Sequence, residues 1–311
     1  MSDRMQLDHL LTEQRNPASD RIDARPTAEI LRIINDEDRK VAASVASEIP
    51  AIGALVDGIV ERMEKAGRLF YIGAGTSGRL GVLDAAECRP TFNAPADLVQ
   101  GVIAGGEGAL ARATEASEDD PSAGIRDLEA RGFGPGDVLV GIAASGRTPY
   151  VLGAIDWARA MGALTAAISC TPHSELASRA EIAITPLPGP EIVTGSTRMK
   201  AGTATKLVLN MISTAVMIRR GAVYGNLMVN VQPTNEKLRH RARRIVGDAA
   251  GVDQATAAQL LDDAGGSVRT AIVMARLGVD RLHAEQLLSE AGNRVSQVLH
   301  RTQTTHGSVS D

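Results

Sequence analysis

Aromatic residues and cysteines are scarce in this sequence of 311 residues, and it carries no net positive charge. Only 2% of the residues are Phe, Trp or Tyr, so the stacking platforms of single-stranded nucleic-acid binders have little to be built from. The formal net charge is −4, whereas a nucleic-acid-binding surface normally shows as a strongly basic patch. Two cysteines, Cys88 and Cys170, make neither a disulfide framework nor a metal-binding pair. We therefore expect no nucleic-acid partner.

Long hydrophobic runs are missing as well. The unbroken apolar stretches fall well short of the ~20 residues that span a bilayer. The first residues, MSDRMQLDHLLTEQRNP, carry charges throughout, unlike the apolar core of a signal peptide. The histidines show no metal-binding spacing such as H-E-x-x-H. The sequence thus predicts a cytoplasmic protein with no membrane partner, no metal and no cofactor.

Three loops rich in glycine and hydroxyl groups are the most informative feature present. Ser77-Gly78-Arg79 and Ser145-Gly146-Arg147 each follow an apolar run, and Gly195-Ser196-Thr197-Arg198 precedes a long apolar helix. A strand that opens through such a loop into a helix aims N–H groups, hydroxyls and the positive helix end at one point. Three such loops indicate a site for the phosphate of a small metabolite. The candidate phosphate-binding residues are Thr76, Ser77, Gly78, Ser145, Gly146, Arg147, Thr148, Ser196 and Thr197.

Two other interpretations of these loops compete with a phosphate site. Residues 73–78 match the dinucleotide fingerprint G-x-G-x-x-G, but no acidic residue ends the second strand to hold a ribose hydroxyl. The serines could instead cap helices, which stays an even alternative for either Ser-Gly-Arg loop taken alone. The basic side chains beside the loops either add charge to the site or are simply solvated or engaged in structural ion pairs, and the second interpretation is favoured for each one singly. These side chains are Arg79, Arg147, Arg198 and Lys200.

Strand-like runs alternate with helical patterns through the middle of the chain. The runs are 69–73, 98–104, 138–143, 164–169 and 182–185, and the helical patterns between them are 78–88, 123–130 and 149–161. This order predicts an α/β fold, a doubly wound parallel five-stranded sheet covered on both faces. Ligands bind beyond the carboxyl ends of the strands in such sheets, where all three loops fall.

Helical patterns also extend the chain beyond the sheet on both sides. They cover 27–46 and 49–66 before it, and 203–218, 234–249, 253–264, 268–277 and 280–291 after it. We expect an N-terminal arm and helix at 1–48, the sugar-phosphate domain at 49–233, a small C-terminal helical bundle (UBA-like) at 234–303 and a disordered tail at 304–311.

Carboxylates are the best source of proton transfer, because no histidine lies in a promising loop. Glu87 lies near the end of the helix that starts at the first loop, and its small neighbours predict a partly apolar setting that would raise its pKa. A second cluster runs from Glu115 to Pro121. Asp120 suits an N-cap before Pro121, which leaves Glu115 and Glu118 near the mouth of the site.

Several long blocks resemble the signature blocks of N-acetylmuramic acid 6-phosphate etherases. The blocks are Ile72 to Cys88 (IGAGTSGRLGVLDAAEC), Ala143 to Tyr150 (AASGRTPY), Gly195 to Thr203 (GSTRMKAGT), Thr12 to Pro17 (TEQRNP) and Asn226 to Asn230 (NLMVN). That family carries a sugar isomerase (SIS) domain and is related to animal glucokinase regulatory proteins. This chain departs from it with Arg89-Pro90 after the cysteine and with Glu115-Ala-Ser-Glu118-Asp119 in place of Glu-Gly-Ala-Glu-Asp.

The resemblance implies a lyase that splits N-acetylmuramic acid 6-phosphate into N-acetylglucosamine 6-phosphate and D-lactate without a cofactor. By family correspondence, Glu87 is the proton donor to the departing lactate and Glu118 the base at C2. It further implies a homodimer, in which we expect Thr12 to Pro17, carrying Arg15, to close over the partner's site. The alternatives are an arm packed on its own subunit and a disordered arm. Two rival functions are a sugar-phosphate sensor without catalysis and a phosphosugar isomerase.

Overall fold

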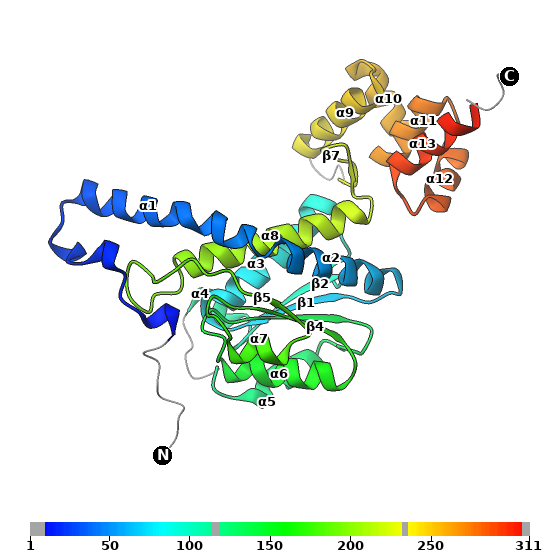
Figure 1. Ribbon diagram of the computed structural model, residues 1–311. Coiled ribbons are helices and arrows are strands. Elements are labelled where there is room, and N and C mark those ends of the chain that lie inside the picture. Colours follow the sequence, from blue (N-terminus) through cyan, green and yellow to red (C-terminus); the bar gives the residue numbers. More distant parts are fainter. Residues whose placement is uncertain (1–9, 113–117, 232–235, 307–311) are drawn as a thin grey trace. The chain divides into compact units, whose positions relative to one another are not determined.

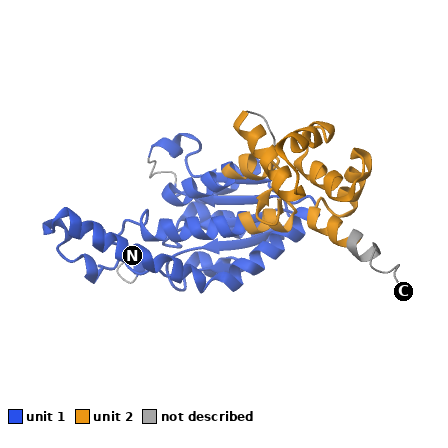
Figure 2. Ribbon diagram, turned by 90° about the horizontal axis from the view of Figure 1, so that it is seen from above, with its two compact units in different colours: residues 1–86, 96–213 blue, residues 87–95, 214–311 orange. Residues whose placement is uncertain are grey.

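The protein, described from a computed structural model, divides into two compact units (Figures 1 and 2). The structure describes residues 10–112, 118–231 and 236–306. The first unit holds residues 1–86 and 96–213, and the second holds residues 87–95 and 214–311. Helices α3 (Gly75–Phe92) and α8 (Lys200–Arg219) run from one unit into the other.

A five-stranded parallel sheet forms the centre of the first unit. Its strand order is β2-β1-β3-β4-β5, as the doubly wound prediction requires. The strands are β1 (Leu69–Gly73), β2 (Val99–Ile103), β3 (Val138–Ile142), β4 (Leu164–Ile168) and β5 (Ile182–Ile184). Gly73 pairs with Ile103 on one side and Ile142 on the other, so the carboxyl ends of the central strands lie level at one edge.

Helices cover both faces of this sheet (Figure 1). On one face, α5 (Pro121–Glu129), α6 (Pro149–Ala160) and α7 (Glu175–Arg179) enclose a core that includes Phe70, Leu139 and Ile155. On the other face lie α2 (Ile49–Glu64), α3 and α8. Gly81 of α3 lies so close to the sheet that a Cβ atom would come within 2.9 Å of Tyr71 Cβ. Tight helix-on-sheet packing is therefore built into both layers.

Among the described residues, α8 is the only individual helix that is long and apolar enough, by length and composition, to cross a membrane. However, 56% of its apolar window is buried inside the structure, and Val208, Leu209 and Ile212 are fully enclosed. A bent pair of helices, α1 with α2, passes the same test only when taken together. Core helices commonly meet these criteria, and α8 is a core helix here.

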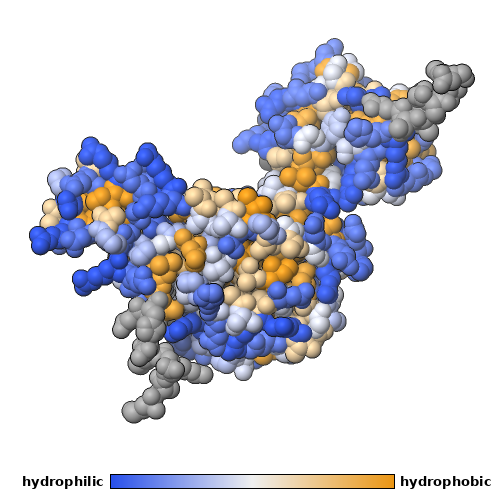
Figure 3. Space-filling view, viewed as in Figure 1, coloured by the Kyte–Doolittle hydropathy of each residue, from blue (hydrophilic) through white to orange (hydrophobic). Residues whose placement is uncertain are grey.

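The N-terminal arm consists of three short 3-10 helices before the long helix α1 (Thr27–Ala46). These are η2 (Leu11–Glu13), η3 (Pro17–Ser19) and η4 (Ile22–Ala24). Hydrophilic residues cover much of the surface of the arm and α1 (Figure 3). Val41 and Val45 are buried, so the second half of α1 belongs to the core of the first unit.

The second unit is mainly helical. Its elements are a hairpin of β6 (Val223–Tyr224) and β7 (Leu227–Met228), followed by α9 (Glu236–Ala250), α10 (Gln254–Asp263), α11 (Val268–Leu277), α12 (Arg281–Glu290) and α13 (Val295–His306). Side chains of Asp253, Ser267 and Asp280 cap three of the helices. The hairpin is not predicted by the sequence, whereas most of α13 lies within the region 234–303 expected to be helical, although no separate helical pattern marks it. Of the expected tail, residues 304–306 end α13, and 307–311 lie outside the described residues.

Candidate functional site

The first and third hydroxyl loops meet at the start of α8. Gly202, in the first turn of that helix, is so placed that a Cβ atom would lie 3.4 Å from the Thr197 carbonyl oxygen and 3.6 Å from Thr76 Cγ2. Both contacts are ordinary van der Waals distances. The loop after β1 and the loop before α8 therefore lie against each other, although more than 100 residues separate them in the sequence.

The second hydroxyl loop is joined to the end of β4. Cys170 N donates a hydrogen bond to the Ala144 carbonyl (2.9 Å), and Leu176 N donates to the Gly146 carbonyl (2.9 Å). The thiol of Cys170 contacts the Ala201 carbonyl at 3.9 Å, which ties this loop to the start of α8. Burial raises the pKa of the Cys170 thiol to about 12, so it serves as a neutral packing group. A continuous set of contacts thus gathers all three loops at one edge of the sheet.

The side chains that carry hydroxyl groups in these loops are half-buried, and the serines of the first two loops do not act as N-caps of the helices that follow. Helix α3 begins at Gly75, so Ser77 lies inside its first turn, and the N-cap of α6 is Thr148, which makes no side-chain cap hydrogen bond. The capping interpretation is therefore wrong for both Ser-Gly-Arg loops. Ser145 Oγ accepts only a long 3.4 Å bond from Arg147 N in the described part of the chain.

Glu118 is fixed beside the second loop by its backbone. The Tyr150 N–H donates to the Glu118 carbonyl oxygen at 3.0 Å, and Asp120 caps α5 by accepting from Ser122 N at 2.8 Å, as the sequence predicts. The Glu118 residue is half-buried. It therefore lies next to the start of α6, which the loop Ser145 to Thr148 leads into. Glu115 lies outside the described residues.

Two of the basic residues beside the loops, Arg79 and Lys200, use their side chains to hold other parts of the protein. This agrees with the structural interpretation that the sequence favours for each of them. The Arg79 guanidinium donates to the backbone carbonyls of Leu110, Ala109 and Arg112, holding down the short helix α4 (Gly108–Ala111). Lys200 is fully buried and pairs with Glu37 of α1 at 2.6 Å. Neither side chain is available to a phosphate.

The amino end of α8 is closed to anions by the protein itself. The two carboxylate oxygens of Glu191 accept hydrogen bonds from Lys200 N and Ala201 N, each at 2.9 Å. Glu191 is 1% exposed, so the N–H groups and the positive end of α8 are already satisfied. The helix end that the sequence predicted as an anion site is therefore occupied by Glu191, and the hydroxyls of Ser196 and Thr197 stay the candidates in the third loop.

Glu87 is exposed, so the expectation of a partly apolar setting is wrong. It is the first residue of the second unit, whereas Glu118 belongs to the first. The carboxyl group that α3 does bury is that of Asp84, which accepts a hydrogen bond from Ser213 Oγ at 3.0 Å. Burial raises the pKa of Asp84 to about 6, although hydrogen bonds from Ser213 and Tyr71 favour its charged form. Sequence reasoning missed Asp84, despite its place in the same signature block.

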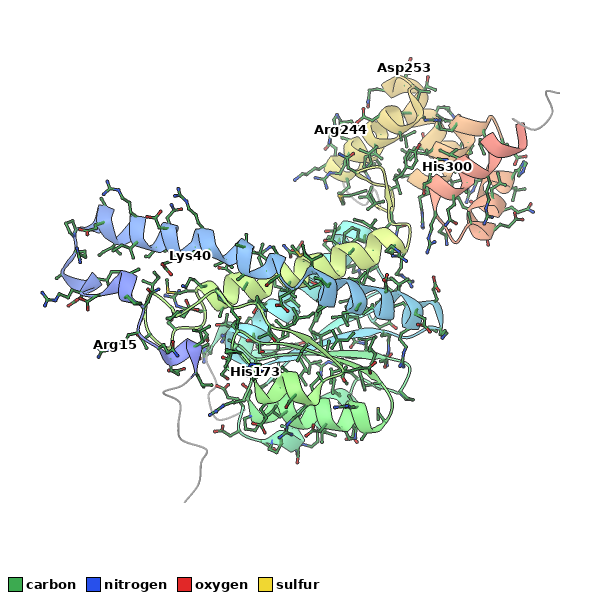
Figure 4. The ribbon with its side chains drawn as sticks, viewed as in Figure 1. Arg15, Lys40, His173, Arg244, Asp253 and His300 are labelled. Atoms are coloured by element: carbon green, nitrogen blue, oxygen red, sulfur yellow. The ribbon has the colours of Figure 1, made fainter. Side chains whose placement is uncertain are left out.

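Within this chain the arm contacts the residues around the third loop, and its closure over a partner's site stays a prediction. Gly195 N donates to the Thr12 carbonyl at 3.1 Å, and Asn16 Nδ2 donates to the Pro190 carbonyl at 2.9 Å. Arg15 is exposed on this segment, and His173 lies in the loop after β4 (Figure 4). Among the described residues, no group of three or more His, Cys, Asp or Glu side chains could hold a metal ion.

A doubly wound α/β sheet with glycine- and hydroxyl-rich loops gathered at its carboxyl edge has the architecture of a sugar isomerase (SIS) domain. Residues 51–159 match the family model described as the glucokinase regulatory protein N-terminal SIS domain. A putative phosphosugar isomerase from Bacteroides fragilis NCTC 9343 is 21% identical, with a TM-score of 0.47 over 63% of this chain and 94% of that chain.

Curated relatives extend over nearly the whole chain. An N-acetylmuramic acid 6-phosphate etherase from Symbiobacterium thermophilum is 56% identical over 86% of this chain and 89% of its own length. One from Photorhabdus laumondii is 54% identical over 87% of this chain and 90% of its own length. The chain belongs to the N-acetylmuramic acid 6-phosphate etherase family.

Proposed function

We propose that this protein is a carbon–oxygen lyase that converts N-acetylmuramic acid 6-phosphate and water into N-acetylglucosamine 6-phosphate and D-lactate. The observation that carries the proposal is the 56% identity to an etherase over 86% of the chain, which includes the three hydroxyl loops. The site chemistry agrees with it, because half-buried hydroxyls and carboxylates are what phosphate binding and proton transfer require.

In the mechanism that the family resemblance implies, the sugar first opens to its aldehyde, which acidifies the proton on C2. Glu118 takes that proton, the C3–O bond breaks, and Glu87 gives a proton to the oxygen of the departing lactate. A double bond then joins C2 and C3. Water adds to C3 while Glu87 takes its proton and Glu118 returns a proton to C2. Both carboxyl groups end in their starting states.

We assign the 6-phosphate to the three hydroxyl loops. Thr76, Ser77 and Gly78 come from the start of α3, and Ser196 and Thr197 from the loop before α8. The remaining ligands are Ser145, Gly146, Arg147 and Thr148, where Arg147 is the nearest candidate for a positive charge. Because Glu191 already accepts hydrogen bonds from the first N–H groups of α8, the third loop would bind the phosphate through the hydroxyls of Ser196 and Thr197.

The test is to incubate the purified protein with N-acetylmuramic acid 6-phosphate in ¹⁸O-labelled water. We expect D-lactate without label and a sugar product labelled at C3, because the C3–O bond is the one that breaks and reforms. Label in the lactate would contradict this mechanism. Binding of the substrate without any lactate would favour a sugar-phosphate sensor, which the match to a glucokinase regulatory protein domain makes the leading rival.

We further propose a cytoplasmic homodimer. Leu83 of α3 and Met211 of α8 are exposed apolar side chains on the same layer of the first unit, at 49% and 39% exposure. Contact with a second copy of the chain would bury this apolar surface and remove it from water. Sedimentation equilibrium of the wild type and of Met211→Glu tests this, because a charge in the covered surface should shift the population towards monomers.

A further inference from the structure

A buried ion pair lies behind the third hydroxyl loop, and the reaction proposed above does not use it. Lys200 Nζ lies 2.6 Å from Glu37 Oε2 and donates to the Pro188 carbonyl at 2.9 Å. The side chains are 1% and 6% exposed. A buried ion pair of this kind gives little net stability compared with an apolar pair of the same size, so a role other than stability is worth testing for it.

The same carboxylate reaches the N-terminal arm. Asn16 Nδ2 donates to Glu37 Oε2 at 3.0 Å and to the Pro190 carbonyl at 2.9 Å. Lys40, on the next turn of α1, also pairs with Glu37 (Figure 4). Burial alone would raise the pKa of Glu37, but the hydrogen bonds from Lys200, Lys40 and Asn16 lower it to about 2, so Glu37 stays charged.

The third loop is held at both ends by these elements. At its start, Gly195 N donates to the Thr12 carbonyl of the arm. At its end, Lys200 is fixed by Glu37 through its side chain and by Glu191 through its backbone. Ser196 and Thr197 lie between these two attachment points. Their position therefore depends on the arm at one end and on the buried lysine at the other.

We propose that Asn16, Glu37 and Lys200 are positioning residues that couple docking of the N-terminal arm to the placement of Ser196 and Thr197. This rests on the proposed role of those hydroxyls in holding the 6-phosphate. Because coupling is reciprocal, a sugar phosphate bound at the third loop stabilises the docked arm by the same factor as the docked arm stabilises binding.

The experiment compares three full-length variants with the wild type. Glu37→Met with Lys200→Met removes the ion pair while keeping an apolar volume, which should leave the fold intact. Asn16→Ala removes the hydrogen bonds from the arm to Glu37 and the Pro190 carbonyl, while Glu37 keeps its pairing with Lys200 and Lys40. Asp36→Asn is the matched control, since Asp36 precedes Glu37 on α1 but is exposed. Thermal unfolding establishes that each variant is folded, and Asn16→Ala carries the test if the double variant is not.

Two quantities are measured for each variant. The first is the kinetics of lactate release, and the second is tryptic cleavage after the exposed Arg15, with and without N-acetylglucosamine 6-phosphate. In the wild type the ligand should slow that cleavage. In the double variant and in Asn16→Ala, we expect the ligand to lose this effect and KM to rise by roughly 10-fold, with kcat changed far less. Asp36→Asn should match the wild type.

A folded variant with unchanged KM and ligand protection would overturn the proposal, as would an equal effect of Asp36→Asn. If only the double variant keeps the wild-type KM and ligand protection, the ion pair has a stabilising role alone, and its part in the proposal is overturned. Failure of the proposed function looks different: the wild type would release no lactate, while the cleavage measurement would still report whether the arm and the phosphate site are coupled.

Discussion

The backbone N–H of Tyr150 donates a hydrogen bond to the carbonyl oxygen of Glu118 at 3.0 Å. Tyr150 is the second residue of α6, directly after the loop Ser145 to Thr148, and it is fully buried. Its hydroxyl is held by Asp127 of α5 at 2.6 Å. The backbone of the proposed base is therefore held by α6, the helix that follows the second hydroxyl loop. Both the proposed proton-transfer group and this part of the proposed phosphate site are thus positioned by α6.

Removing either proposed proton-transfer group should stop the reaction without preventing binding. We expect Glu118→Gln and Glu87→Gln each to lower kcat by about 10²–10⁴-fold, the usual loss for a general acid or base. The amide keeps the shape and the hydrogen-bonding oxygen, so the dissociation constant for the sugar phosphate should change little. Lactate release and calorimetric titration measure the two quantities.

The control for this pair of variants is Asp119→Asn, which neutralises the exposed neighbour of Glu118. It should keep near-normal kcat. If Glu118→Gln behaves as Asp119→Asn does, Glu118 is not the base. If only Glu87→Gln remains active, another acid must protonate the lactate, and Asp84, one turn earlier on α3, is then the first group to examine.

Removing the Ser145 hydroxyl should weaken phosphate binding and leave stability nearly unchanged. In the described part of the chain, its oxygen makes one long contact, to Arg147 N at 3.4 Å. A hydrogen bond to a charged phosphate is worth about 1.5–3 kcal/mol, so we expect Ser145→Ala to bind all 6-phosphosugars ~10–100-fold more weakly. Titration with N-acetylglucosamine 6-phosphate and a urea unfolding curve separate binding from folding. A normal affinity would remove Ser145 from the phosphate site.

Features that depend on residues close together in the chain are predicted from the sequence better than features that depend on contacts between distant residues. The strands were predicted to within a residue or two of their ends because their residues are almost all buried, so the pattern is strong. The cap of α5 followed from Asp120 and Pro121, adjacent in the chain. Short helices such as α7, at five residues, give too little periodicity to be recognised.

Long-range contacts explain the part of the site that sequence reasoning missed. Glu191 occupies the end of α8 from a position nine residues away, and Lys200 finds Glu37 across 163 residues. No local pattern indicates either contact. The exposure of Glu87 is a similar case, because small neighbours along a helix do not say which elements pack against that face.

Replacing Gly146 by alanine should damage the second loop in two ways. Its φ of +69° is strained for any residue with a side chain, and a Cβ atom would lie 2.3 Å from Ser174 Cβ. Gly132→Ala is the matched control, since Gly132 has a φ of +64° and no atom within 4 Å of the added Cβ. We expect the control to lose about 1–2 kcal/mol of stability from backbone strain alone. Gly146→Ala should lose more, and should also bind sugar phosphate weakly, in urea unfolding and titration experiments.

The buried carboxyl of Asp84 should make stability depend on pH near neutrality. Its pKa rises from 3.8 in the unfolded chain to about 6 in the folded protein, chiefly through burial. Because the folded state holds this proton more tightly, its contribution to stability is complete below the unfolded pKa. That contribution is lost as the pH rises through about 6. At pH 7 to 8, the folded protein therefore contains a buried carboxylate that weakens it.

Asp84→Asn cannot ionise, yet it can still accept the hydrogen bond from Ser213. We expect the free energy of unfolding of this variant, relative to the wild type, to improve between pH 4 and pH 8 by up to about 3 kcal/mol, the free-energy equivalent of the pKa shift. Urea unfolding across this pH range measures the difference, with the exposed Asp97→Asn as the control. A difference that stays constant with pH would mean that Asp84 titrates in the folded protein as it does in the unfolded chain.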